Sequence, residues 1–390
     1  MVERVIFPFR GAELGGSHIA AFTLAHGLQR RFGTGCLVLA PEGTLILKEA
    51  ERLGLRTLAS GEPPTGKNSL VGDFTRAEAR RAVLAPDTRW GATIVHASDI
   101  NSLRAWGPPG KALGAGVVYH HHALNRMWWL PHLRGLSFAD EVIAVSEATL
   151  KAIRPIRRQA VKELNPFDID MSVSRACARQ ALLAENGWRE DALIVGFVGN
   201  LWRRKRAAFF LEAAGAMFRK NSRCRFVMFG RDGDQTVADM REKAMELGVG
   251  AITAFPGFRQ PAEANIASLD VLMCPAPREP FGRTLVEAIM LGVPVVATEG
   301  AGHSEIIGTW GGGMLVPEEA TAEDMAAACR GVLEKTGELV LPEARRRQIA
   351  ADLSSDAHAE RVMRIYERAI GRQRKVETKG AKASEARRAA

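Results

Sequence analysis

Short apolar runs alternate with longer amphipathic segments along the first half of the chain. The apolar runs predict strands in five ranges: 4–8, 35–39, 93–96, 116–119 and 141–145. Helical spacing of apolar residues lies between them, most clearly at 17–31 and 75–84. Strands that alternate with helices are typical of a parallel sheet, so the first half predicts a doubly wound α/β domain.

The second half repeats this pattern. Strands are predicted at 192–199, 225–229, 251–255, 271–274 and 294–297, with a helix at 207–219. A last amphipathic helix is predicted at 356–370, where Val362, Ile365 and Ala369 form an apolar stripe. We therefore expect a second doubly wound domain, with 167–189 as the hinge that leads into it.

Composition agrees with two α/β domains. The chain has 390 residues, of which 46% are hydrophobic and 25% charged, as in ordinary globular proteins. No apolar run approaches the roughly 18 residues that span a bilayer, and MVERVIFPF at the start predicts a strand, not a signal peptide. Five scattered cysteines without a Cys-x-x-Cys pair indicate neither disulfides nor zinc. We expect a cytoplasmic protein.

The net charge of +9 is concentrated near the C-terminus. Residues 371–390 hold seven Lys or Arg against two Glu, so five of the nine excess positive charges lie there. Few large apolar residues accompany them, which predicts a disordered basic tail. A solvated tail is the simplest interpretation, and we expect no nucleic-acid partner. A second basic cluster, Arg154, Arg157, Arg158 and Lys162, adds to a weak attraction for an anionic membrane.

The most informative stretch runs from residue 277 to 298. Pro280 and Gly282 interrupt the chain just before an apolar helical pattern, which Gly292 ends before a β-branched run. Glu279 is therefore expected on a loop at a helix N-terminus, and Glu287 inside that helix. The N–H groups of a first helical turn have no partner within the helix, so they form a potential phosphate site.

A simpler interpretation of the two glutamates also exists. Glu287 lies one turn after Arg283, and an exposed pair at this spacing stabilises a helix by roughly 0.5 kcal/mol. Glu279 is equally compatible with a solvated loop carboxylate. Two glutamates at this spacing are weak evidence alone, so the surrounding loop, helix and strand carry the assignment.

In its full form, Glu279, seven residues and Glu287 within EPFGRTLVEAIMLGVPVVAT, the stretch resembles the signature of retaining glycosyltransferases of the group 1 type. The resemblance implies a GT-B fold, with two Rossmann-like doubly wound parallel-sheet domains facing a cleft. It implies that Glu279 binds donor-sugar hydroxyls and Glu287 the ribose hydroxyls. The other donor-binding residues implied here are Phe281, Gly282, Arg283 and Thr284.

A basic loop follows the first strand of the second half, in FVGNLWRRK at 197–205. Lys205 matches a lysine of the family, whereas Asn200 stands where arginine is usual, and Arg204 is a candidate replacement. The resemblance implies that these residues hold the donor diphosphate, whose charge grows as the glycosidic bond breaks. It also implies that the loop with Phe258 holds the base. Asp-x-Asp spacings at 168–170 and 232–234 are common by chance, and we assign no metal to them.

A glycine-rich loop follows the first predicted strand, with Gly15 and Gly16 before a helix that Ser17 is expected to cap. The loop lacks the G-x-G-x-x-G dinucleotide fingerprint, and a tight connection is the simpler interpretation. Its resemblance to the glycine-rich loop of the family implies that the two glycines lie over the donor diphosphate or frame the acceptor.

Three consecutive histidines end the strand at 116–119. Adjacent strand residues point to opposite faces, so a metal site is not expected. The resemblance implies that His122 bonds the donor sugar, with His121 as the second choice, while backbone bonding at a polar strand end remains the simpler alternative. Trp128, beside Trp129, is a candidate acceptor wall or a core residue, and Ser146 is an acceptor candidate at a strand end.

These patterns, together with the resemblance, imply four segments. They are an N-terminal acceptor domain at 1–175, a nucleotide-sugar donor domain at 176–355, a helix crossing back at 356–371 and the basic tail at 372–390. The implied activity is retaining, metal-independent transfer from a nucleoside-diphosphate sugar to a sugar or lipid-linked glycan, in cell-envelope synthesis at the inner face of the membrane. The alternatives are a noncatalytic sugar-nucleotide-binding scaffold and a phosphorylase or epimerase on the same fold.

Overall fold

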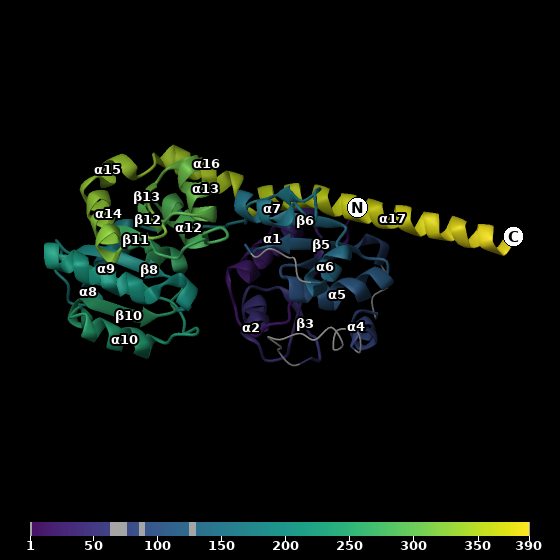
Figure 1. Cartoon of the computed structure of the whole chain (residues 1–390), viewed down its shortest axis with the longest axis horizontal. Helices are drawn as coiled ribbons and strands as arrows, with labels where there is room; N and C mark the ends of the chain where they lie inside the picture. Colours follow the sequence, from purple (N-terminus) through teal and green to yellow (C-terminus); the bar gives the residue numbers. More distant parts are fainter. Residues whose placement is uncertain (1, 63–75, 86–89, 125–129, 390) are drawn as a thin grey trace. The chain divides into compact units, whose positions relative to one another are not determined.

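A computed structural model of the protein describes residues 2–62, 76–85, 90–124 and 130–389. The chain forms two compact units, one of residues 1–168 with 352–390 and one of residues 169–351 (Figure 1). The expected boundaries lie at 175 and 355. Arg175 itself belongs to the second unit, where it donates hydrogen bonds to the carbonyls of Gly292 and Leu269, at 2.7 Å each.

The first unit is built on a parallel sheet with strand order β3-β2-β1-β4-β5-β6-β7. Its strands are β1 (Arg4–Pro8), β2 (Gly35–Ala40), β3 (Arg56–Ala59), β4 (Thr93–Ala97), β5 (Gly116–His121), β6 (Glu141–Ala144) and β7 (Val161–Lys162). Its helices are α1 (Gly16–Phe32), α2 (Leu45–Arg52), α4 (Ala77–Leu84), α5 (Ile100–Ala112), α6 (Leu130–Ser137), α7 (Glu147–Ile153), α17 (Ser355–Ala389) and the short η1 (Trp90–Ala92).

The second unit has the strand order β10-β9-β8-β11-β12-β13, again all parallel. Its strands are β8 (Leu193–Val198), β9 (Cys224–Phe229), β10 (Thr253–Gly257), β11 (Val271–Cys274), β12 (Val295–Thr298) and β13 (Gly313–Val316). Its helices are α8 (Arg175–Glu185), α9 (Ala207–Lys220), α10 (Val237–Glu246), α11 (Ala262–Ala267), α12 (Arg283–Leu291), α13 (Ala301–Trp310), α14 (Ala322–Glu334), α15 (Thr336–Leu339), α16 (Glu343–Asp352), η2 (Arg203–Lys205) and η3 (Gly250–Ile252). The predicted fold class of two doubly wound parallel-sheet domains is confirmed.

Alternation along β1 divides the core of the first unit between two layers. Val5 and Phe7 pack with α1 and α17 on one face of the sheet, whereas Ile6 packs with Trp106 of α5 on the other. The central strands β1, β2, β4, β5 and β6 contribute apolar residues to both layers, which is why their apolar runs are nearly continuous.

Helix α17 lies against α1, β4, β5 and β6 of the first unit (Figure 1). Close approach is possible because residue 27 of α1 is glycine, and a Cβ there would collide with the Ser355 carbonyl. We expected a disordered tail from residue 372, but α17 continues to Ala389. The physical reason is that Ala, Glu, Lys and Arg, which dominate this segment, are strong helix formers.

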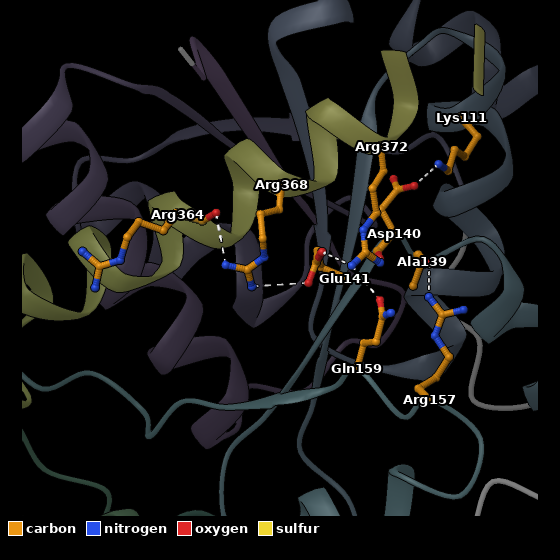
Figure 2. Close-up of polar contacts among 9 residues, drawn as sticks. All are labelled: Lys111, Ala139, Asp140, Glu141, Arg157, Gln159, Arg364, Arg368 and Arg372. Carbon is orange, nitrogen blue, oxygen red and sulfur yellow. Dashed lines mark hydrogen bonds and ion pairs between the residues drawn. The ribbon is translucent and has the colours of Figure 1, made fainter. Parts of the chain in front are cut away.

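The middle of α17 is anchored by arginines around buried Glu141 (Figure 2). Arg372 lies 3.0 Å and Arg368 3.4 Å from the two carboxylate oxygens of Glu141. Arg372 also donates to the Asp140 carbonyl at 2.9 Å and to Oε1 of Gln159 at 2.7 Å. These contacts connect α17 to the start of β6 and explain how a carboxylate is tolerated in the sheet.

The start of α12 has a backbone conformation that favours glycine. Gly282, its N-cap, has φ of 96°, and a Cβ there would lie 2.8 Å from Cδ2 of His303. Gly308, inside α13, has no such constraint, because a Cβ at that position would meet nothing within 4 Å. The two glycines therefore form a matched pair for mutation.

We expect Gly282→Ala to lower the free energy of unfolding of the second unit by about 1–3 kcal/mol, because alanine is strained at positive φ and would push against His303. Gly308→Ala should instead stabilise by up to about 1 kcal/mol, since alanine is the better helix former. Urea unfolding of both variants measures this. Equal midpoints for the two variants would contradict the interpretation.

Candidate functional site

The topology of the second sheet brings two sequence-distant loops together. Its strand order reverses between β8 and β11, and open α/β sheets bind ligands at the carboxyl ends of the strands where the order reverses. The loop after β8 carries Arg204 and Lys205, and the loop after β11 carries Glu279. These are the residues that the sequence singled out for the donor diphosphate and sugar.

The loop after β8 is held by its neighbour after β9. Leu201 forms an isolated parallel bridge with Asp232, and the Arg203 N–H donates to Oδ1 of Asp234 at 2.6 Å. The two aspartates of the Asp-x-Asp spacing at 232–234 thus hold the loop after β8 in place. Asn200 begins the same loop, and its carbonyl accepts from the Trp202 N–H at 2.8 Å.

Lys205 forms the central contact of the site. Its Nζ lies 2.8 Å from Oε2 of Glu279, and Nη1 of Arg204 lies 3.6 Å from the same oxygen. The side chain of Glu279 is 14% exposed and that of Lys205 24%, while Arg204 is 64% exposed. Burial alone would raise the pKa of Glu279, but the two cations outweigh it and lower the pKa, so the carboxylate is charged.

The second glutamate has a different environment. Glu287 lies 3.5 Å from Arg283, the i,i+4 contact of the simpler interpretation, but the pair is only about one-sixth exposed, at 17% and 16%. Burial raises the pKa of Glu287 despite Arg283, and burial also lowers the pKa of Arg283. The Arg283–Glu287 ion pair is therefore present but largely buried, unlike the exposed pair of the simpler interpretation. The ribose role of Glu287 stays a prediction.

Backbone strain is concentrated around these loops. Among the described residues, positive φ at non-glycine positions occurs at Arg206 (55°), Arg278 (52°) and Ala301 (45°). Arg206 follows Lys205, Arg278 precedes Glu279, and Ala301 begins α13, whose Gly302 N–H donates to the Glu279 carbonyl at 2.9 Å. Strained residues of this kind cluster at ligand sites in proteins.

His303 is a residue of the site that the sequence analysis did not select. It is buried in the first turn of α13, and its Nδ1 lies 3.1 Å from the Thr298 carbonyl. Burial lowers its pKa even though Glu279 and the Thr298 carbonyl act in the opposite direction. In the sequence, only the position of His303 in the loop and helix that follow β12 indicated that it could belong to the site.

The remaining donor-binding predictions lie on the same unit. Gly282 caps α12, Phe281 is buried beside it, and Thr284 lies in the first turn. Phe258 follows edge strand β10 and is 46% exposed, with the Arg231 guanidinium 3.6 Å above its ring. An exposed aromatic ring beside an arginine can stack with a base, and this role stays a prediction.

In the first unit, Gly15 is the N-cap of α1, and the helix begins at Gly16. The expected cap by Ser17 was wrong, because the helix starts earlier and Nδ1 of His18 accepts from the Gly15 N–H at 3.1 Å. Burial lowers the pKa of His18 to about 4, so this acceptor is neutral. The ligand roles of Gly15 and Gly16 stay predictions.

The three histidines point alternately, as their positions on a strand predict. His120 faces α17, with His358 stacked at 6.3 Å between ring centroids, whereas His121 is fully buried with Nδ1 at 3.0 Å from the Tyr119 hydroxyl. Burial lowers the pKa of His121 to about 4. His122 follows β5 and is partly buried. Their ligand roles stay predictions.

Of the acceptor candidates, Ser146 is the buried N-cap of α7, where its Oγ accepts from the Thr149 N–H at 3.2 Å. This gives Ser146 a structural role and leaves its acceptor role untested. Trp128 lies outside the described residues. Within the described ranges, no three His, Cys, Asp or Glu side chains are placed to hold a metal ion. No helix in the described part of the chain is long and apolar enough to cross a membrane.

Residues 192–335 match the family described as Glycosyl transferases group 1. The chain is 27% identical over 286 residues to D-inositol 3-phosphate glycosyltransferase of Saccharomonospora viridis, covering 70% of this chain and 63% of that protein. It is 29% identical over 253 residues to 2-deoxystreptamine glucosyltransferase of Streptomyces kanamyceticus, covering 63% and 64%. The chain thus spans somewhat less than two thirds of these relatives.

Solved structures show the same fold. A crystal structure of HepE from Anabaena in complex with UDP and glucose has a TM-score of 0.78 at 18% identity, covering 94% of this chain and 99% of that chain. Sucrose-phosphate synthase from Thermosynechococcus elongatus has a TM-score of 0.72 at 19% identity, covering 95% and 99%. The chain is thus similar to the glycosyltransferases of group 1 type, with its family match confined to residues 192–335, and it has the GT-B fold.

Proposed function

We propose that the protein is a retaining, metal-independent glycosyltransferase that moves a sugar from a nucleoside diphosphate to a hydroxyl acceptor. The observation that carries this proposal is the Lys205–Glu279 pair, placed where the second sheet reverses its strand order and beside the N-terminus of α12. Cations and helix N–H groups suit a diphosphate, while a charged carboxylate suits sugar hydroxyls. UDP and glucose in HepE support this class of donor.

In the proposed reaction, the acceptor hydroxyl attacks the sugar carbon on the face from which the diphosphate leaves. A phosphate oxygen of the leaving group takes the hydroxyl proton, so the protein supplies positioning and charge neutralisation. Lys205 and Arg204 neutralise the leaving group, Glu279 holds the sugar and Glu287 the ribose. The acceptor is a sugar or lipid-linked glycan, as in cell-envelope synthesis.

Three alternatives make different predictions for the same experiment. A noncatalytic sugar-nucleotide-binding scaffold is compatible with Asn200, which stands where the family usually has arginine. It would bind sugar nucleotides without turnover. A phosphorylase would need inorganic phosphate, and an epimerase would convert the sugar without releasing nucleotide. A transferase should release nucleotide slowly in water and faster when an acceptor is added.

We expect Lys205→Ala to slow transfer by roughly 100-fold, because the lysine would meet charge that grows in the transition state. Lys220→Ala, an exposed lysine at the end of α9, is the matched control and should leave transfer unchanged. Nucleotide release from UDP-, GDP- and ADP-sugars, with a panel of sugar acceptors, measures both. Wild-type turnover should persist in excess EDTA, and its loss with recovery on adding magnesium would contradict metal independence.

The two glutamates should have separable effects. Glu287→Ala should weaken free nucleotide and sugar nucleotide alike, by roughly 10- to 100-fold, the value of a lost charge-assisted hydrogen bond of about 1.5–3 kcal/mol. Glu279→Ala should spare free-nucleotide affinity and reduce turnover. Calorimetry with nucleotide and sugar nucleotide measures this, with exposed Glu212→Ala of α9 as control. Equal losses of free-nucleotide affinity in both variants would refute the assignment.

We also propose a cytoplasmic protein that contacts the inner face of the membrane weakly. The contact would use Arg154 and Arg158 near α7, both exposed, whereas Arg157 donates to the Ala139 carbonyl and is held internally (Figure 2). Only the exposed arginines are then available to anionic lipid.

Replacing Arg154 and Arg158 together by alanine should weaken binding to vesicles containing phosphatidylglycerol by up to about 30-fold at low salt, at up to roughly 1 kcal/mol per charge. The control replaces Arg189 and Lys220 of the second unit, which are also exposed. Cosedimentation measures the effect. Identical binding of both double variants would remove these arginines from a membrane role.

A further inference from the structure

His303 has one ring nitrogen fixed by the backbone. Its Nδ1 lies 3.1 Å from the Thr298 carbonyl oxygen, and a carbonyl only accepts hydrogen bonds, so Nδ1 carries the proton in this contact. The neutral ring is therefore basic at Nε2. Because the imidazole is buried, its orientation is set by this bond and by packing.

The free edge of the ring lies against the N-cap of α12. A Cβ built on Gly282 would lie 3.2 Å from Nε2 and 2.8 Å from Cδ2 of His303. The first-turn N–H groups of α12 begin at this point, and they have no partner within the helix. Nε2 is thus adjacent to the position proposed for the donor diphosphate.

Charged groups of opposite sign surround this imidazole. Glu279 favours its protonation, Lys205 opposes it, and burial opposes it most, so the pKa of His303 lies below its ordinary value. Arg204 also faces Glu279, and the backbone of Arg278 lies close to Gly300 at the start of α13. Burial raises the pKa of the nearby Cys274 thiol to about 12, so that group is uncharged.

We infer that His303 takes up a proton on Nε2 when a nucleoside diphosphate binds beside Gly282, and that the resulting imidazolium positions the diphosphate. This inference rests on the proposed function. A bound diphosphate brings two or three negative charges next to Nε2 and competes with Glu279 for Lys205, and both changes favour the charged ring. The proton comes from solvent and returns to it when the diphosphate leaves.

His303 then acts as a positioning residue that distinguishes product from donor. Free nucleoside diphosphate carries more negative charge than the diphosphate of a sugar nucleotide, so it should induce more protonation. The imidazolium would consequently favour the state in which the glycosidic bond has broken. Diphosphate affinity should also rise as the pH falls from about 8.5 to 6.5.

The test is calorimetry of UDP, GDP and ADP binding at pH 7.5, in two buffers with different ionisation enthalpies. The wild type should take up about 0.5–1 more proton than His303→Asn, whose amide N–H replaces Nδ1 at Thr298 but which cannot be protonated. The variant should lose roughly 5- to 10-fold in affinity at pH 6.5 and little at pH 8.5. His26→Asn, in the first unit, is the control and should behave as the wild type.

The possible results separate the two proposals. If none of the three nucleoside diphosphates binds the wild type, the proposed function fails. If one binds with the same proton uptake and the same pH dependence in wild type and His303→Asn, the inference about His303 is overturned while the function stands. Binding by His303→Asn with unchanged stoichiometry shows that the variant is folded.

Discussion

The ion pair between Lys205 and Glu279 is the interaction on which the second unit's site depends. The two residues are 74 positions apart, and both side chains are largely buried. A buried charge without a partner is costly, so each residue makes the burial of the other acceptable. The pair therefore fixes the loop after β8 against the loop after β11, at the reversal of strand order where open α/β sheets bind ligands.

The same ion pair also affects how a diphosphate could bind. Lys205 and Arg204 both face Glu279, so an incoming diphosphate competes with a carboxylate for its cations. In the proposed complex, the diphosphate would take over the cations, and Glu279 would accept hydrogen bonds from hydroxyl groups instead. A sugar nucleotide supplies both partners at once, whereas a simple anion supplies only one. This argues for a diphosphate with an attached sugar over inorganic phosphate as the ligand.

Sequence reasoning predicted those parts of the molecule that local patterns determine. The two sheets followed from apolar runs, and Lys205 and Glu279 were singled out through the family resemblance of loops that each follow a predicted strand. The distance between them depends on strand order, which local patterns do not contain. Sequence reasoning also missed short edge strands such as β3 and β13, the earlier start of α1 and the extension of α17. His303 was missed because its role depends on contact with Gly282, on another helix.

The two glutamates differ in a way that their spacing alone does not reveal. The pKa of Glu279 is lowered despite burial because two cations face it, whereas the pKa of Glu287 is raised because burial outweighs its ion pair with Arg283. Glu279 is therefore firmly ionised, and Glu287 holds its charge less strongly. If Glu287 binds ribose as proposed, hydroxyl donors would stabilise its ionised form, and binding would be coupled to its charge. The protein's own cations thus stabilise the charge of Glu279, whereas the charge of Glu287 would be stabilised by the proposed ligand.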